Sequence, residues 1–181
     1  MTDLTAYTGT WTIDPAHTRL GFVARHAMVT KVRGSFTEFD GSMDLDGANP
    51  GASSARLTVQ MASVDSGTAD RDAHLKSADF FDVEKFPVMS FASTVVKQVG
   101  DDFVLLGDLT IKDVTRQVEI AVEVESIVTD PWGHTRVGFE GQAEISRKDF
   151  GLTWNVPLDG GGLLVSDTIK IQLDVSATKS A

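Results

Sequence analysis

Residues 117–125 read QVEIAVEVE, and this stretch decides the class of fold. Apolar side chains recur there at every second position: Val118, Ile120, Val122 and Val124. A two-residue period places one set of side chains on each face of a β-strand. The stretch therefore predicts a strand with one buried face and one largely acidic face in water.

The same alternation recurs along most of the chain. From Arg136 to Ile145 and from Ile169 to Ser176, apolar residues again alternate with polar ones or with glycine. Further strands are predicted at residues 9–13, 19–26, 31–39, 41–45, 56–61, 88–96 and 103–111. Turn-forming pairs such as Asp14-Pro15 and Asn49-Pro50 separate these runs. Many strands joined by short turns are typical of an antiparallel sandwich or barrel, so we expect an all-β fold.

One segment breaks the two-residue period, and it predicts a short helix. Residues 66–81 read SGTADRDAHLKSADFF, without an internal proline. Ser66 or Thr68 is the expected N-cap, and Asp70 and Asp72 lie near the positive end of the helix dipole. A single helix among many strands is expected to plug or flank a barrel.

Length and charge bound the class of protein. A chain of 181 residues suits one domain, so we expect residues 1–181 to form a single unit. The formal net charge of −10 argues against nucleic-acid binding, which depends on clustered cations that neutralise phosphates. The same negative net charge repels an anionic membrane, although the basic residues near Lys31 and Arg33 could form a local patch that such a membrane attracts. We expect a soluble protein with no nucleic-acid partner and no stable membrane insertion.

The chain has no cysteine, which excludes disulfides, thiolate nucleophiles and cysteine-based zinc sites. Its first residues, MTDLTAY, lack the basic start and the apolar run of a signal peptide. No other stretch approaches the ~18–20 apolar residues of a membrane span. These features favour a cytoplasmic location.

Motifs for catalysis or metal binding are weak. The four histidines, His17, His26, His74 and His134, form no HxH, HxxxH or HExxH pair. A metal would have to gather ligands across the fold, for example His17, His26 and His74. No GxSxG motif is present, and Gly160-Gly161-Gly162 lies in no nucleotide-binding fingerprint. We predict no catalytic residues, no metal site and no cofactor.

Two predicted strands carry large apolar residues on one face. Leu20, Phe22, Ala24 and His26 share a face of the first, and Met89, Phe91, Ser93 and Val95 share a face of the second. In a small barrel such residues either fill the core or line a cavity. The residue pattern leaves both readings open.

Several longer motifs occur in a fixed order between Trp11 and Val175. They are WTIDPAHT at 11–18, RDAHLKSADFFD at 71–82, GDLTIKDVT at 107–115 and ISRKDFG at 145–151. In these motifs the chain resembles the YceI-like family, polyisoprenoid-binding proteins with a lipocalin-like barrel. Asp113 stands where the family commonly has glycine, and many members carry a secretory leader that this chain does not show.

The resemblance implies an extended antiparallel barrel around a long apolar channel. Such a channel accepts an isoprenoid chain, a quinone tail or a fatty-acid derivative, for transport, storage or sensing and without catalysis. The resemblance places tail contacts at Phe22, Phe36, Phe39, Phe80, Phe81, Phe91 and Trp154. It places head-group contacts at His26, Arg71 and His74, beside Asp72.

Other readings remain beside this one. Arg71 and Asp72 are equally suited to fixing the helix to the barrel, and Trp154 to a core position with its N–H bonded to a backbone carbonyl. A small enzyme acting on an isoprenoid or quinone would use His26 and His74 as acid–base groups or metal ligands. A packed interaction module would use a strand edge or a symmetric face instead, and a homodimer fits this pattern.

Overall fold

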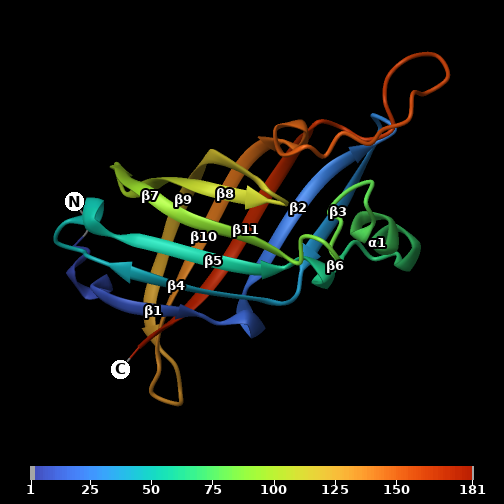
Figure 1. Ribbon diagram of the computed structural model, residues 1–181. Coiled ribbons are helices and arrows are strands. Elements are labelled where there is room, and N and C mark those ends of the chain that lie inside the picture. Colours follow the sequence, from blue (N-terminus) through green and yellow to red (C-terminus); the bar gives the residue numbers. More distant parts are fainter. Residues whose placement is uncertain (1–2, 181) are drawn as a thin grey trace.

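The protein is one antiparallel β-sheet that closes on itself, with a helix at one end (Figure 1). The computed structural model describes residues 3–180, which contain eleven strands and one α-helix, α1 (Ala69–Lys76). The strands are β1 (Gly9–Ile13), β2 (Arg19–His26), β3 (Thr30–Phe36), β4 (Phe39–Leu45), β5 (Ser54–Gln60), β6 (Val64–Asp65), β7 (Val88–Val99), β8 (Asp102–Ile111), β9 (Val114–Thr129), β10 (Thr135–Ser146) and β11 (Thr168–Lys179). The prediction of an antiparallel barrel with a short flanking helix is confirmed.

Six of the short strands join in pairs, so that the barrel has eight long strands. Only the 3-10 turn η2 (Pro15–His17) and single residues beside it separate β1 from β2. β11 pairs with β2 near its start and with β1 near its end. Likewise β4 pairs with β1 and β3 with β2, while β5 pairs with β4 and β6 with β3. Three bent strands and β7 to β11 therefore close an up-and-down barrel.

The predicted alternation on β9 is confirmed. The four apolar residues of the predicted pattern, Val118, Ile120, Val122 and Val124, line the interior, while Glu119, Glu123 and Glu125 are exposed. On β11 the alternate residues Ile169, Ile171, Leu173 and Val175 also line the interior. A barrel wall has one interior and one exterior face, and a two-residue period matches that arrangement.

The strand predicted at residues 31–39 is wrong in its extent, because the backbone bends at Thr37 and Glu38. Thr37 N–H donates to the Ser63 carbonyl at 3.3 Å, and the Glu38 carbonyl accepts from Gln60 N–H at 2.9 Å. Beyond Phe36 these two bonds take the place of the regular β3–β6 ladder. They join the bend at Thr37 and Glu38 to the neighbouring bend between β5 and β6. β3 therefore ends at Phe36 and β4 begins at Phe39.

The predicted inward face of β7 is correct only for its first half. The register against β8 shifts between Ser93 and Val95, as at a β-bulge. Met89 and Phe91 line the interior, but beyond the bulge Val96 takes the inward position and Val95 is 40% exposed. The extra residue reverses which side chains face inward.

The predicted helix at residues 66–81 is too long, since α1 covers only Ala69–Lys76. Thr68 is the N-cap residue, but its side chain makes no capping bond, whereas Asp70 and Asp72 do occupy the first turn. At the other end, the Ser77 hydroxyl donates to the His74 carbonyl at 2.6 Å. Phe81 N–H then donates to the Leu75 carbonyl at 2.9 Å, and the chain turns away from the helix axis.

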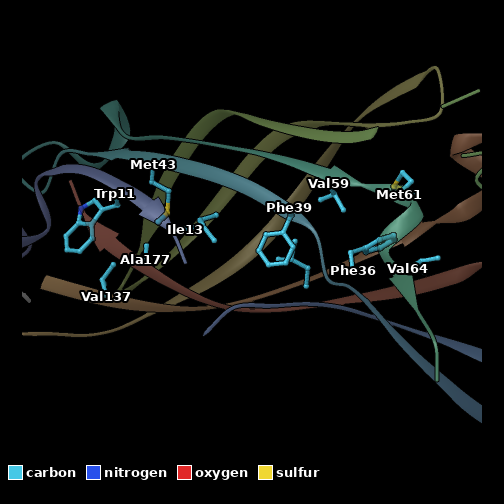
Figure 2. Packing of buried hydrophobic residues seen from close by; sticks show 11 residues of the cluster. Trp11, Ile13, Phe36, Phe39, Met43, Val59, Met61, Val64, Val137 and Ala177 are labelled. Carbon is cyan, nitrogen blue, oxygen red and sulfur yellow. The ribbon is translucent and has the colours of Figure 1, made fainter. Parts of the chain in front are cut away.

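A packed core lies where β1 meets β11. Trp11 is fully buried there, and its indole N–H donates to the Tyr7 carbonyl at 2.7 Å. Figure 2 shows Trp11 packed beside Met43, Val137 and Ala177. Burying an aromatic ring with its polar atom satisfied stabilises this end of the barrel.

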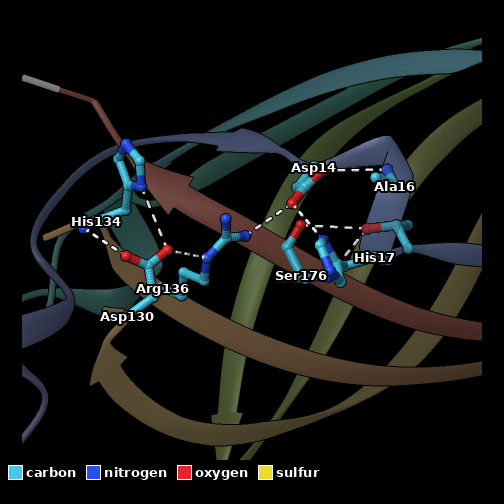
Figure 3. A network of polar contacts seen from close by, with 8 residues as sticks. Asp14, Ala16, His17, Asp130, His134, Arg136 and Ser176 are labelled. Carbon is cyan, nitrogen blue, oxygen red and sulfur yellow. Dashed lines mark hydrogen bonds and ion pairs between the residues drawn. The ribbon is translucent and has the colours of Figure 1, made fainter. Parts of the chain in front are cut away.

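A polar network outside the barrel joins η2 to the β9–β10 turn (Figure 3). Arg136 donates to Asp14 Oδ2 and to Asp130 Oδ2, each at 2.7 Å. His17 and His134 contact the same two carboxylates at 2.8 and 3.3 Å. The bond from Arg136 lowers the pKa of both Asp14 and Asp130 below its ordinary value, and His17 adds to the effect at Asp14.

Within residues 3–180, no helix is both long enough and apolar enough to cross a membrane.

Candidate functional site

A cavity runs through the barrel interior. Its volume is about 330 Å³, many times the ~10–15 Å³ that one water needs. Nearly all of the side chains around it are apolar, and they come from the inward faces of every long strand. Such a space excludes ordered water and suits an apolar molecule.

Two phenylalanines lie against the barrel wall because glycines face them. The ring of Phe22 occupies the place of a side chain on Gly34, with Cζ 2.3 Å from where a Cβ would stand. Phe91 covers Gly107 in the same way, with Cζ 2.4 Å from the corresponding point. Each ring thus extends sideways over a neighbouring strand, which leaves space along the barrel axis.

Three aromatic rings meet at the cavity end that faces α1. Phe36 lies between Phe22 and Phe81, with ring centroids 5.7 and 6.0 Å apart. All three residues line the cavity. Tilted rings at these separations attract one another beyond their area burial.

A second aromatic group covers this end from outside. The His74 ring packs edge-on against Trp154, with centroids 4.5 Å apart, and Phe80 lies 5.0 and 5.4 Å from those two rings. Phe80 is the member that lines the cavity. His74 Nε2 contacts Asp79 Oδ2 at 2.9 Å, which fixes the imidazole on the outer side. The indole N–H of Trp154 has no hydrogen-bond partner among the described residues.

Arg71 and Asp72 hold the start of α1. Arg71 donates to Ser66 Oγ at 2.9 Å and to the Ser66 carbonyl at 2.6 Å. Asp72 accepts from Ser66 N–H at 2.7 Å and from the Ser66 hydroxyl, which lowers the pKa of Asp72 below its ordinary value. Ser66 is 7% exposed, so this clamp fixes the helix to the end of β6.

A buried arginine that no sequence pattern singled out closes the same end. Arg147 begins the 3-10 turn η5 (Arg147–Phe150), lines the cavity and is only 3% exposed. Its guanidinium donates to the carbonyls of Leu152, Trp154, Val165 and Ser166. Burial lowers the pKa of Arg147 below its ordinary value. The four bonds tie the connection between β10 and β11 to the barrel, and the only sequence signal was its place in the ISRKDFG motif.

The opposite end of the cavity carries its polar lining. Asp46, Ser53, Ser54 and Arg56 lie there, on the connection between β4 and β5 and on β5 itself. Asp46 Oδ1 accepts from the backbone N–H groups of Ala48 and Asn49, and Ser53 Oγ accepts from Asp46 N–H. These polar groups are already bonded within the connection, and the surface of the cavity itself is almost wholly apolar.

The structure separates the ten predicted ligand residues into two sets. Phe22, Phe36, Phe80, Phe81 and Phe91 line the cavity. Phe39 packs in the core outside the lining, and His26, Arg71, His74 and Trp154 also lie outside it. Ligand contact by any of the ten stays a prediction.

The histidines do not converge on a metal site. In residues 3–180, no group of three or more histidine, aspartate or glutamate side chains is arranged to hold a metal ion. His17, His74 and His134 each contact a nearby aspartate instead.

Comparison with known proteins agrees with this architecture. The model of the YceI-like domain family matches residues 11–177. The UPF0312 protein plu2095 of Photorhabdus laumondii is 41% identical over 134 residues, which cover 74% of this chain and 70% of that protein. The crystal structure of BcnA from Burkholderia cenocepacia matches with a TM-score of 0.79 and 25% identity, over 92% of this chain and 99% of that one. A polyisoprenoid binding domain from Saccharophagus degradans shares the fold, with a TM-score of 0.67 and 15% identity over 94% of this chain and 98% of its own.

Proposed function

The chain belongs to the YceI-like domain family, and from this membership we propose that it binds a long apolar lipid of isoprenoid type inside its barrel. The observation that carries the proposal is the elongated apolar cavity, whose lining runs from Asp46 at one end to Val165 at the other. The shared fold of the polyisoprenoid binding domain from Saccharophagus degradans supports this class of ligand.

Hydrophobic burial supplies the binding energy. Each CH₂ group moved from water into an apolar site contributes about 0.8 kcal/mol, so a prenyl tail needs no ion pair to be retained. Selectivity then comes from the length and shape of the cavity. The five lining phenylalanines are the proposed tail contacts: Phe22, Phe36, Phe80, Phe81 and Phe91.

The distribution of polar groups orients the ligand. We propose that the polar head lies near Asp46 and Ser53, where polar residues of the connection between β4 and β5 border the cavity, and not at the α1 end where the resemblance placed it. The tail then extends toward Phe81 and Leu152 at the end that α1 and η5 cover.

The proposed role is to carry, store or sense the lipid and not to convert it. His26 and His74, the candidate acid–base residues, both lie outside the cavity lining, and His74 is engaged by Asp79. Acid–base catalysis by either histidine on the enclosed lipid would need that side chain at the cavity surface.

The test is native mass spectrometry of protein purified without detergent, followed by solvent extraction and lipid identification. We expect a discrete adduct that is released on unfolding and that extracts as a prenyl lipid, an isoprenoid quinone or a related long-chain compound. A clean ligand-free mass, together with no uptake of added polyprenol, would refute the proposal.

A further inference from the structure

The hairpin between β2 and β3 ends in an exposed apolar turn. Met28 is 65% exposed and Val29 is 77% exposed. The neighbouring connection from β10 to β11 adds Val156 and Leu163, which are 42% and 41% exposed. Figure 1 shows this connection, in orange, beside the blue tip of the hairpin.

Specific contacts join the two segments into one surface. Ala27 N–H donates to the Leu164 carbonyl at 2.7 Å, and His26 and Val165 form a backbone bridge. Met28 Sδ lies 2.3 Å from where a Cβ on Gly162 would stand, so the methionine packs closely on that glycine. The four exposed apolar residues therefore belong to two segments that hydrogen bonds and packing hold together.

The turn itself is held in a costly backbone conformation. Ala27 and Met28 have φ angles of 51° and 64°, a region that favours glycine or asparagine. Val29 N–H closes the turn on the His26 carbonyl at 3.1 Å. Strain at an exposed turn made of apolar residues is the kind of outlier that points to function.

Three cations surround this turn without acidic partners. Arg25, Lys31 and Arg33 occupy the outward face of β2 and β3, and Arg25 stands directly opposite Lys31. Like charges in that position repel. No ion pair or side-chain hydrogen bond joins these three side chains to another residue in the described part of the chain, although the protein carries 26 acidic residues.

We propose that this surface docks on an anionic lipid membrane. We call it the basic tip and define it by Arg25, Met28, Val29, Lys31, Arg33, Val156 and Leu163. The apolar residues would enter the boundary between head groups and acyl chains, while the cations lie over anionic head groups. The net charge of −10 repels the remainder of the molecule from such a surface, so the protein approaches tip first.

The position of the tip agrees with the lipid-binding proposal, on which this part of the inference rests. Ala24 and Val165, directly beneath the tip, line the end of the cavity that lies opposite Asp46. A lipid that leaves a bilayer here leads with its head group. The head then arrives at the polar end near Asp46, and the tail remains toward the membrane.

The test is flotation with vesicles of phosphatidylcholine and phosphatidylglycerol, against vesicles of phosphatidylcholine alone. We expect the wild type to float with the anionic vesicles at low salt and to be released at high salt. Met28→Glu/Val29→Glu should weaken binding about tenfold or more. The matched control is Val128→Glu/Trp132→Glu, which makes the same charge change at residues that are 55% and 79% exposed at another hairpin.

The cations have their own pair of variants. Each cation near an anionic surface contributes roughly a fivefold increase in affinity, so Lys31→Gln/Arg33→Gln should also weaken binding about tenfold or more. Lys85→Gln/Lys97→Gln changes the net charge equally at exposed sites outside the tip and should leave binding within about twofold. Circular dichroism verifies the fold of each variant, and Val29→Glu alone serves if Met28 proves necessary for folding.

Several outcomes would overturn the docking proposal. These are no flotation of the wild type, equal losses in tip and control variants, or a concentration-dependent mass that tip variants abolish, which would indicate a contact between copies. The vesicles contain no prenyl lipid, so the two proposals fail separately. A protein that carries lipid but does not bind vesicles would refute only the docking proposal. A protein that binds vesicles but has an empty barrel would refute only the proposed lipid binding.

Discussion

Arg136 and Asp14 lie 122 residues apart in the sequence, yet Arg136 Nη1 donates to Asp14 Oδ2 at 2.7 Å. The bond joins the turn after β1 to the start of β10, on the outside of the barrel. Arg136 also binds Asp130, so one guanidinium holds two carboxylates whose pKa values it lowers. Both carboxylates, those of Asp14 and Asp130, are largely shielded from solvent, and Asp130 is only 8% exposed.

This network predicts a pH-dependent loss of stability. Groups with a lowered pKa in the folded state stabilise it above their unfolded pKa of about 3.9, and this stabilisation is lost as the pH falls toward the folded values. Arg136→Gln should therefore lower Tm clearly at about pH 7, and the deficit should shrink progressively as the pH falls from about 4 toward 2. Thermal melts across this range measure the difference. Lys97→Gln removes an exposed cation elsewhere, and a pH-independent deficit in Arg136→Gln would contradict the prediction.

Adjacent valines on β7 test which face holds the ligand. Val96 lines the cavity and Val95 is 40% exposed. Val96→Glu places a carboxylate in an apolar space and should abolish the lipid adduct in native mass spectrometry, because burying an unpaired charge costs several kcal/mol. Val95→Glu should retain the adduct. Equal retention in the two variants would mean that this stretch of the cavity holds no ligand.

Gly34 tests whether the position of Phe22 keeps the cavity open. A Cβ at Gly34 meets only the Phe22 ring among the contacts closest to it, so Gly34→Ala should push the ring toward the barrel axis. We expect a smaller lipid occupancy and a loss of about 1–3 kcal/mol of stability. The double variant Phe22→Ala/Gly34→Ala removes the clash and should recover lipid uptake. Uptake that stays low in the double variant would show that the glycine acts in another way.

Arg147 is predicted to be a structural residue. Arg147→Met would leave four carbonyls without their donor, at a cost of about 3–5 kcal/mol in the free energy of unfolding. Limited proteolysis should then cut first between residues 152 and 167, and chemical denaturation measures the stability. Lys148→Met alters the exposed neighbour and should change stability by less than about 1 kcal/mol. Similar protection of the connection in both variants would contradict this role.

Alternation in the sequence predicts the wall of the barrel but not its interruptions. The period of two assigns the inward residues of β9, β10 and β11 correctly, because the predicted stretches keep one register and have one dry face. The register of β9 against β10 shifts only beyond Val124. The pattern does not predict the β7 bulge, since Val95 and Val96 are equally apolar and either could face inward. The end of α1 at Lys76 depends on hydrogen bonds from Ser77 and Phe81 that composition does not encode.

The cavity is also beyond what the pattern specifies. Whether Phe22 fills the interior or lies on the wall depends on Gly34, its partner on the neighbouring strand. That pairing is known only once the register is known. Arg147 illustrates the same limit, because its four carbonyl partners lie on a connection with no regular structure.

The pairing of β11 with both β1 and β2 sets the order in which the barrel can form. Every other neighbouring pair of long strands is joined by a comparatively short connection and can assemble early. Only the closing step pairs β1 and β2 with β11, at residues 168–179. This step brings together the segments that are farthest apart in the sequence, so it has the largest entropy cost of loop closure. During synthesis the sheet therefore stays open, with its apolar inner face exposed to solvent, until β11 and its twelve residues have emerged.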